Sequence, residues 1–319
     1  MSCNKSNILN GADSSSIDIA VRALQRDLLV AIPTETVYGL AARASSPSAV
    51  KKIFVVKGRP IGHPLILHVA NKQDLSLWSQ ELSNNARLLA EKYWPGPLTI
   101  IVKRNDKVCD EITGGRDTVA IRCPNHPVAT ELLIRLTDAI VAPSANHFGK
   151  VSPTSASHVA EDFGDEISVI LDGGECSIGV ESTIIDCTTE PPQILRAGAI
   201  SADQIKRECN ITIASATGDS RASGMLDKHY APNCTVELVD DRKDADVRLN
   251  QLNGDGRSSE IIDFGDDLQM FAHELYARLR DADKRLIDVV ITVKPPMSGI
   301  GIAINERLEK AANSNRSRE

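Results

Sequence analysis

Apolar residues in the first two thirds of the chain follow two spacings. Where they recur every three or four positions, as at Ile17, Val21 and Leu24 after Ser16, the pattern predicts a helix. Short apolar runs such as LLVAI (28–32) predict buried strands. Further helices are expected from Pro47–Ser48, from Ser83, near 127–137, near 155–162 and from Ser201 to Cys209, and further strands at 64–69, 98–102, 118–122, 139–142, 167–171, 182–186 and 193–196.

The order of these elements indicates the fold class. Helices and strands are mixed, and the later strands follow one another instead of alternating strictly with helices. Such a mixture is typical of a layered α/β domain, here expected over residues 13–213. Its sheet is predicted to be twisted and mixed rather than purely parallel. Residues 1–16 are polar and are interpreted as a frayed tail.

Residues 214–234 separate this domain from a second unit. They lack periodicity and are rich in small and polar residues, as linkers are. Strands at 235–239, 260–264 and 288–293 and helices near 267–282 and 301–312 then predict a small Rossmann-like α/β domain over 235–319. Because this unit has no G-x-G-x-x-G turn and NGDG (253–256) is interpreted as a simple turn, no dinucleotide site is predicted there.

Composition narrows the class of protein. A length of 319 residues with 42% hydrophobic content suits two globular domains. The net charge of −7 argues against coating nucleic acid through overall charge, but leaves a local basic patch open. No apolar run approaches the ~18 residues of a membrane-spanning helix, and no signal-peptide core is present, so a cytoplasmic protein is expected. The seven cysteines include no C-x-x-C pair, which favours reduced thiols over disulfides or zinc.

Five polar stretches lie beside the apolar strands, where α/β folds usually bind ligands. They are PTETVYGL (33–40), KGRPIGHP (57–64), RDTVAIR (116–122), APSANHFGKVSPTS (142–155) and GVESTIID (179–186). Taken singly, each has a simpler explanation, such as a strand stop, a helix cap or a surface ion pair. All five together favour a binding site.

The residue types in these stretches point to anions. Lys57, Arg59, Arg122 and Arg196 are cations on or beside apolar strands, and Ser144, Asn146 and Ser152 can donate neutral hydrogen bonds to phosphate oxygens. No Walker A pattern and no G-x-S-x-G elbow occur, which argues against a P-loop and a serine hydrolase. His63 and His68 are an odd number of residues apart on a strand-like segment, so a shared metal is disfavoured.

The ordered motifs PTETVYGL, KGRP…HPL…HV, WPGPLTI, TVAIRCPNHP, APSAN…SPT, DGG, GVESTI and LRAG resemble the YrdC-like family. The resemblance is to its long, two-domain form, the L-threonylcarbamoyladenylate synthases. It covers about residues 16–200 and resumes at SGMLDKHYAPN (223–233), similar to that form's linker signature, and at GIGIAINERLEKA near the C-terminus. It implies a twisted α/β sheet with a positively charged cavity.

The resemblance also implies an activity. These synthases make threonylcarbamoyl-AMP from L-threonine, bicarbonate and ATP, with release of pyrophosphate and with Mg²⁺ carried mainly by the phosphates. The product passes to a tRNA threonylcarbamoyl-transferase complex that modifies an adenosine next to the anticodon. A weak direct contact with RNA is left open, and no membrane is involved.

The same resemblance implies roles for individual residues. The threonine group is Thr36, His68, Arg122, Ala142 and Ser182. The ATP group is Arg59, His63, Thr118, Ser144, Ser152, Arg196, His229 and Tyr230. Lys57, Arg59, Ser144 and Asn146 match the family's catalytic Lys/Arg/Ser/Asn tetrad near bicarbonate and the phosphates. The chain departs from the family at His63, where Asn is frequent, and at Ser223, which precedes Gly-Met without the usual proline.

Two alternatives remain at this point. One is a carbamoyltransferase domain of hydrogenase maturation, but such chains carry zinc-finger cysteine pairs and an acylphosphatase-like segment that this sequence lacks. The other is an RNA-binding module, against which the net negative charge and the aromatic content of 3% both argue.

Overall fold

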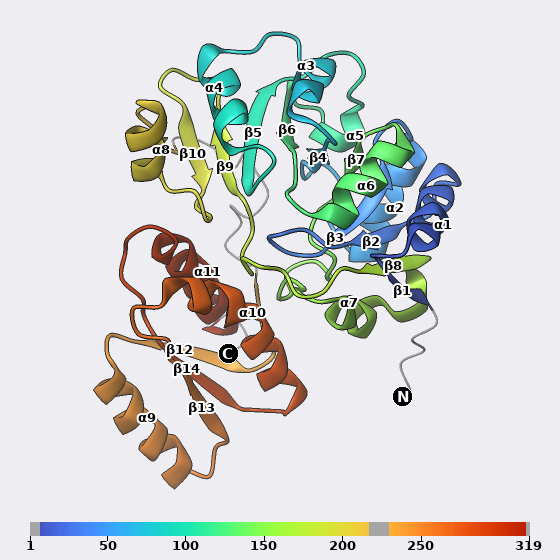
Figure 1. The fold of residues 1–319 in the computed structure, drawn as a ribbon. Coiled ribbons are helices and arrows are strands. Elements are labelled where there is room, and N and C mark those ends of the chain that lie inside the picture. Colours follow the sequence, from blue (N-terminus) through green and yellow to red (C-terminus); the bar gives the residue numbers. More distant parts are fainter. Residues whose placement is uncertain (1–6, 217–229, 317–319) are drawn as a thin grey trace.

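The structure is a computed structural model that describes residues 7–216 and 230–316. Within those residues the strands form an eleven-stranded sheet and a three-stranded sheet. Figure 1 shows the two sheets in separate parts of the molecule, with the N-terminal part built around the larger one.

The larger sheet mixes parallel and antiparallel neighbours, as predicted. For example, β4 pairs with β6 in parallel and β5 pairs with β6 antiparallel. The order across the sheet is β1-β8-β2-β3-β7-β4-β6-β5-β9-β10-β11. The strands are β1 (Ile8–Asn10), β2 (Val30–Ile32), β3 (Gly39–Arg43), β4 (Ile66–His68), β5 (Leu98–Lys103), β6 (Thr118–Arg122), β7 (Ile140–Val141), β8 (Val169–Asp172), β9 (Thr183–Asp186), β10 (Gln193–Arg196) and β11 (Ala214–Ser215).

Serine caps begin several helices of this part. Ser46, Ser83, Ser155 and Ser201 each accept a hydrogen bond from the backbone N–H three residues later, which satisfies one orphan donor of the first turn. The helices are α1 (Ser14–Gln25), α2 (Pro47–Lys57), α3 (Leu75–Trp78), α4 (Asn84–Tyr93), α5 (Asp110–Thr113), α6 (Pro127–Leu136), α7 (Ala156–Phe163) and α8 (Ala202–Cys209), with 3-10 turns η2 (Lys72–Asp74) and η3 (Gly164–Glu166).

Both faces of the larger sheet carry packed helices. In β2, Val30 and Ile32 join the apolar cluster of α1 and α6, whereas Ala31 between them joins the cluster of α2, α4 and α7. This alternation follows from the two-residue period of a strand. The run LLVAI is therefore apolar throughout because both of its faces are buried.

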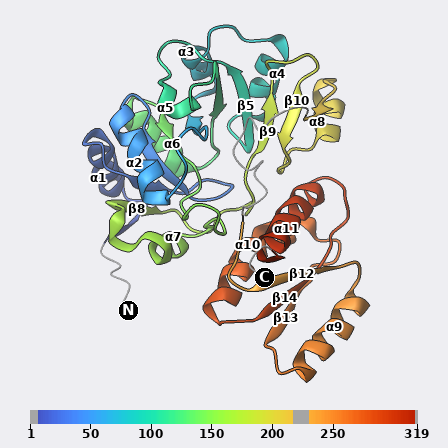
Figure 2. The same ribbon diagram turned by 180° about the vertical axis from the view of Figure 1, so that it is seen from behind.

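The C-terminal part is a three-layer α/β unit. Strands β12 (Thr235–Val239), β14 (Val289–Val293) and β13 (Ser259–Ile262) lie side by side and parallel in that order. Figures 1 and 2 show α10 (Leu268–Lys284) and α11 (Gly301–Arg316) between this sheet and the N-terminal part, with α9 (Arg242–Gly254) on the outer face. The arrangement agrees with the predicted small Rossmann-like unit.

Predictions about several elements were wrong or incomplete. Residues 8–10 are not a frayed tail, because β1 pairs with β8 in parallel. Strand β3 was not predicted, since GLAAR has little β-propensity and is held by its neighbours β2 and β7. Helix α9 was not predicted, because only Ala245 and Leu252 are buried in it and the apolar stripe is weak. It also takes up Asn253 and Gly254 of the predicted NGDG turn.

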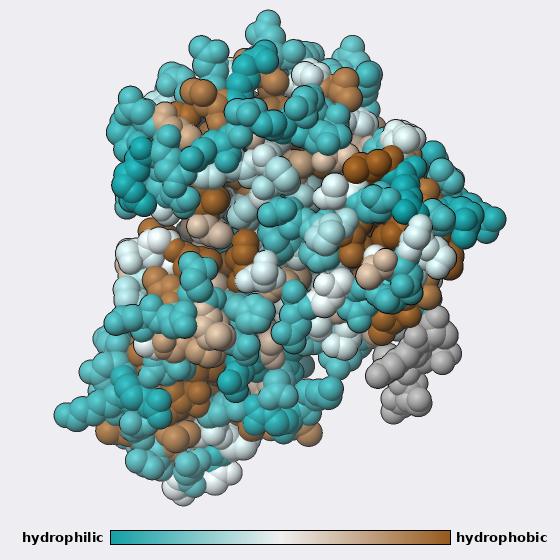
Figure 3. Space-filling model, viewed as in Figure 1, coloured by the Kyte–Doolittle hydropathy of each residue, from teal (hydrophilic) through white to brown (hydrophobic). Residues whose placement is uncertain are grey.

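Figure 3 shows a mostly hydrophilic face on which apolar residues form small separate groups. Among the described residues, no helix combines the length and apolar character needed to cross a membrane.

Candidate functional site

Part of one sheet face is lined by strand residues alone. Ile66, Ile101, Ala120, Ile184 and Leu195 form a small buried cluster that contains no helix residue. The period of two places polar side chains beside this cluster on the same face. These are His68 on β4, Thr99 on β5, Arg122 on β6 and Ser182 just before β9. Backbone register sets Arg122 opposite both His68 and Thr99, so residues distant in sequence meet here.

Arg122 makes a buried ion pair with Glu35. Its Nη2 lies 2.8 Å from Glu35 Oε2, and the two side chains are 5% and 6% exposed. The contact lacks the geometry of a hydrogen bond, and neither Glu35 oxygen has a hydrogen-bond partner among the described residues. The Nε of Arg122 donates only a long bond of 3.4 Å to the Gly96 carbonyl. Buried charged groups are usually hydrogen-bonded, so this pair has unused capacity for a ligand.

His68 is a neutral acceptor next to Arg122. Burial and the Arg122 charge lower the pKa of His68 to about 3. Its Nδ1 lies 3.1 Å from the Ile66 carbonyl, which can only accept, so Nδ1 carries the proton. Nε2 is then an acceptor suited to a hydroxyl or an amine.

Thr36 and Ala142 complete the predicted threonine group. Thr36 is fully buried, and its Oγ1 lies 2.9 Å from that of Thr34. Because Thr34 donates its own proton to the Val37 carbonyl, Thr36 donates to Thr34 and keeps its lone pairs. Ala142 is buried, and its N–H donates to the Ile66 carbonyl at 3.1 Å, which ties the 142–147 loop to β4.

Lys57 tethers that loop from the other side. It lies at the end of α2, is buried, and its Nζ donates to the carbonyls of Ser144 (2.6 Å) and Asn146. Burial and the Arg59 charge lower the pKa of Lys57 well below its usual range. The buried Asn146 donates its amide to the carbonyls of His147 and Lys150, while its Oδ1 has no partner among the described residues. Lys57, Ser144 and Asn146 of the predicted tetrad therefore meet, and the catalytic role of the tetrad stays a prediction.

Arg59 and His63 meet at Phe148. The Arg59 guanidinium carbon lies 5.9 Å from the Phe148 ring centre, and the His63 ring packs edge-on against the same ring. Burial and the Arg196 charge lower the pKa of Arg59 to about 10. Burial, followed by the Arg59 charge, lowers the pKa of His63.

Ser182 joins the two ends of the site. Its hydroxyl lies 2.8 Å from Thr99 Oγ1 and accepts a hydrogen bond from Arg196 Nη2 at 3.0 Å. The Nε of Arg196 donates to the Ser182 carbonyl, also at 3.0 Å. Ser182 thus links the Arg122 end to a second cation.

Ser152 and Tyr230 lie where the two parts of the molecule meet. Ser152 donates to Glu181 Oε1 at 2.6 Å, and Glu181 Oε2 accepts from Tyr276 at 2.9 Å and from Arg307 Nε at 3.2 Å. Tyr230 is buried and stacks on Tyr276, with ring centres 5.7 Å apart. Thr118, half-buried, begins β6 at the end away from Arg122, and His229 lies outside the described residues.

Four buried polar residues at this site had no assigned role: Glu35, Glu181, Tyr276 and Arg307. Glu35 and Glu181 lie in polar stretches beside strands, and this position is the sequence signal that could have identified them as site residues. Arg307 stands in the C-terminal motif GIGIAINERLEKA. No local sequence pattern identifies Tyr276 as a site residue, because only the tertiary fold brings it to Glu181.

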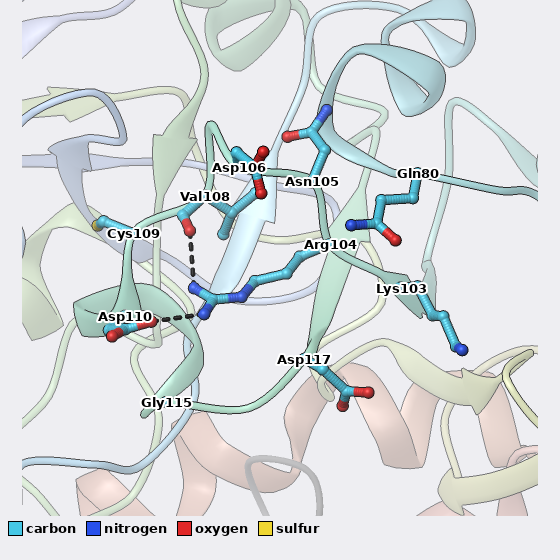
Figure 4. A pocket seen from close by; sticks show the side chains of 10 residues that line it. All are labelled: Gln80, Lys103, Arg104, Asn105, Asp106, Val108, Cys109, Asp110, Gly115 and Asp117. Carbon is cyan, nitrogen blue, oxygen red and sulfur yellow. Dashed lines mark hydrogen bonds and ion pairs between the residues drawn. The ribbon is translucent and has the colours of Figure 1, made fainter.

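A surface pocket elsewhere is no part of this site. Figure 4 shows it around Arg104, which donates to the Val108 carbonyl and to the Asp110 carboxylate. Its volume is ≈ 570 Å³ and its lining contains none of the predicted site residues. Because its arginine is already paired, it is a poor alternative anion site.

Two family models match the chain. The Sua5, YciO and YrdC model, described as "Telomere recombination", matches residues 22–198. The model of the "Threonylcarbamoyl-AMP synthase, C-terminal domain" matches residues 200–313.

Curated relatives and a solved structure match both parts together. The chain is 39% identical to a threonylcarbamoyl-AMP synthase of Pyrococcus abyssi over 96% of each chain, and 37% identical to one of Bacillus subtilis over 92% of each. The crystal structure of Pyrococcus abyssi Sua5 complexed with L-threonine superposes with a TM-score of 0.90 at 38% identity, covering 96% of this chain and 98% of that one.

Proposed function

The chain belongs to the threonylcarbamoyl-AMP synthase family, and on that premise we propose that it makes L-threonylcarbamoyladenylate from L-threonine, bicarbonate and ATP. The observation that carries the proposal is the buried Arg122–Glu35 pair with unused hydrogen-bonding capacity, linked through Ser182 to the cation Arg196. An amino acid and a nucleotide can be held at the two ends of such a site.

The chemistry needs no enzyme nucleophile. The neutral amine of threonine attacks the carbon of bicarbonate, a C–N bond forms, and water leaves to give a carbamate. A carbamate oxygen then attacks the α-phosphorus of ATP while the α–β P–O bond breaks and pyrophosphate departs. Holding anionic reactants against each other is the main task of the protein, and fixed cations stabilise that arrangement.

The threonine end combines complementary groups. Arg122 can hold the threonine carboxylate through its planar fork, while Glu35 can accept from the amine. The acceptor Nε2 of His68 suits the threonine hydroxyl. Thr36, Ala142 and Ser182 complete the proposed group.

The nucleotide end is cationic. Lys57, Arg59, Ser144 and Asn146 would hold bicarbonate and phosphates, with Arg196, His63, Thr118, Ser152, Tyr230 and His229 around the rest of ATP. We place these cations around one positively charged cavity. Mg²⁺ would be carried mainly by the phosphates, where it would neutralise charge.

The wider setting is part of the same proposal. The product would be the first intermediate of threonylcarbamoyladenosine modification of tRNA and would pass to a separate transferase complex in the cytoplasm. We divide the chain into a catalytic domain (13–213), a linker that closes over the nucleotide (214–234) and a C-terminal domain (235–319). Weak direct contact with RNA stays a prediction.

Pyrophosphate release tests the function directly. Purified protein with ATP and Mg²⁺ should release pyrophosphate only when both L-threonine and bicarbonate are supplied, and the adenylate should appear by mass spectrometry. Release that ignores threonine would contradict the proposal.

Two arginine variants test the assigned ends. Arg122→Ala should raise the KM for threonine, and Arg59→Ala should raise the KM for ATP. Each should lower kcat/KM by about 30-fold or more, because removing one partner of a charged contact costs about 2–5 kcal/mol. Arg248→Ala, at a partly exposed pair with Glu237 in the C-terminal part, is the matched control and should leave both KM values unchanged.

A further inference from the structure

The C-terminal motif GIGIAINERLEKA places a buried arginine against the catalytic part. Arg307 of α11 is 1% exposed, and besides Glu181 it reaches the Ala197 carbonyl through Nη1 at 2.6 Å. Burying an unpaired arginine costs several kcal/mol, so the contact with Glu181 is needed to keep Arg307 buried. Its partner Glu181 directly precedes Ser182, just before β9.

Helix α10 presents a second contact to the same region. Tyr276 and Arg280 are one turn apart and share a face. Tyr276 donates to Glu181, and Arg280 Nη2 donates to the Val151 carbonyl at 2.6 Å, next to Ser152. Arg280 is itself held by Asp162 at 3.0 Å. The helix therefore fixes both the backbone of 151–152 and the carboxylate that receives the Ser152 proton.

Ala231 and Asn233, at the end of the linker, hold the loop that leads to Ser152. Ala231 N–H donates to the Gly149 carbonyl at 2.8 Å, and Lys150 Nζ donates to Asn233 Oδ1 at 2.8 Å. The Lys150 carbonyl in turn accepts from Asn146. The loop from Asn146 to Ser152 is thus braced along its length by the C-terminal side of the molecule.

We propose that Glu181 is a positioning residue through which the C-terminal domain fixes Ser152 as a hydrogen-bond acceptor for the nucleoside part of ATP. Ser152 has one hydroxyl proton, and the carboxylate takes it, so its oxygen can receive a bond but cannot donate one. Phosphate oxygens at neutral pH offer no proton. The nucleoside offers ribose hydroxyls and the exocyclic amine, and one of these is the partner of Ser152.

The inference deepens the proposed function and rests on it. Affinities are measured by calorimetry for ATP and for three triphosphates that lack the 2′-hydroxyl, the 3′-hydroxyl or the exocyclic amine. Ser152→Ala should weaken ATP about tenfold, as expected for one lost hydrogen bond in a buried site, yet leave the affinity of one analogue unchanged. An equal loss for all four nucleotides would indicate a phosphate contact and overturn the proposal, as would no loss at all.

Tyr276→Phe tests the link to the C-terminal domain. Removing this hydroxyl keeps the ring stacked on Tyr230 but takes one donor from Glu181. The KM for ATP should therefore rise about threefold, while kcat and the KM for threonine stay constant. In the Ser152→Ala background the same change should add nothing, because both act through one hydroxyl. Additive effects would refute the link.

Arg285→Ala is the control. Arg285 follows the last residue of α10 and forms an exposed pair with Glu260, away from Glu181, so the variant should keep the wild-type KM for ATP. Should Tyr276→Phe fail to fold, the nucleotide series with Ser152→Ala still decides the role of Ser152. Arg280→Lys then tests the contact of α10 with the Val151 carbonyl through the KM for ATP. The nucleotide affinities are measured without turnover. A wild-type protein that binds ATP but releases pyrophosphate independently of threonine would therefore contradict the proposed function without deciding the role of Ser152.

Discussion

Two buried glutamate–arginine pairs lie in the site, and they are satisfied very differently. Glu181, held by Arg307, accepts on both oxygens, from Ser152 on one and from Tyr276 and Arg307 on the other. Glu35, held by Arg122, is equally buried but accepts on neither oxygen from any described residue.

The difference separates a structural pair, Glu181–Arg307, from the pair that we propose binds threonine, Glu35–Arg122. A buried carboxylate with all its bonds made stabilises one arrangement of its neighbours, here the junction of two domains. A buried carboxylate without them is an energetic cost that a ligand can relieve by supplying donors. Threonine, with an amine beside a carboxylate, can supply a donor to Glu35 and acceptors to Arg122.

The same substitution at both glutamates should give the largest contrast. Glu181→Gln removes the charge that three donors converge on and should lower the free energy of unfolding by about 3–5 kcal/mol. Glu35→Gln breaks no hydrogen bond but leaves the buried Arg122 charge unpaired, so it should cost less than Glu181→Gln, about 1–3 kcal/mol in stability, while raising the KM for threonine by about 100-fold. Urea unfolding and pyrophosphate release measure the two effects.

Glu237→Gln serves as the control for both, since its pair with Arg248 is partly exposed and should be worth under about 1 kcal/mol. Equal stability losses at Glu35 and Glu181 would remove the distinction between the pairs.

Acid should weaken the Arg122 end through His68. The pKa of His68 is about 3 when folded and near 6.5 when unfolded, so the unfolded chain binds the proton first as pH falls. The contribution is complete above pH 6.5 and declines towards pH 3, reaching a loss of about 2 kcal/mol at pH 5. His68→Asn should reduce the difference in unfolding free energy between pH 7.5 and pH 5 by that amount.

His158→Asn gives the comparison away from the threonine end, because burial lowers the pKa of His158 as well, to about 4. His158→Asn should also reduce the change in unfolding free energy between pH 7.5 and pH 5, but it should leave the KM for threonine unchanged. His68→Asn should raise that KM. A pH dependence unchanged by His68→Asn would show that this imidazole is not buried in the neutral form.

The smallest effect is expected where the two ends join. Thr99→Val removes one hydroxyl from Ser182 at nearly constant volume and should cost about 1 kcal/mol in stability and a few-fold in the KM for threonine. Thr183→Val is the matched control, since Thr183 is equally buried but bonds only the backbone of Ile200. A KM shift of the same size in both variants would mean that Ser182 does not transmit the effect.

The sequence alone was sufficient for features that are local. Apolar runs located strands such as β5 and β6, and serine caps located the starts of α4 and α8, because these signals depend on residues a few positions apart. The motif residues Lys57, Ser144 and Asn146 were recognised from their order, and two hydrogen bonds of the Lys57 ammonium join them. Strand β3 was missed because only its neighbours across the sheet define it.

The tertiary structure alone decided which charges meet and which are satisfied. No spacing in the sequence pairs Arg122 with Glu35 or Arg307 with Glu181, since these contacts follow from sheet register and from the docking of α10 and α11. Whether a buried carboxylate accepts three hydrogen bonds or none depends on side chains that arrive from distant elements. The sequence therefore determined the fold class, the family and the chemical groups of the site, while long-range packing determined their pairing.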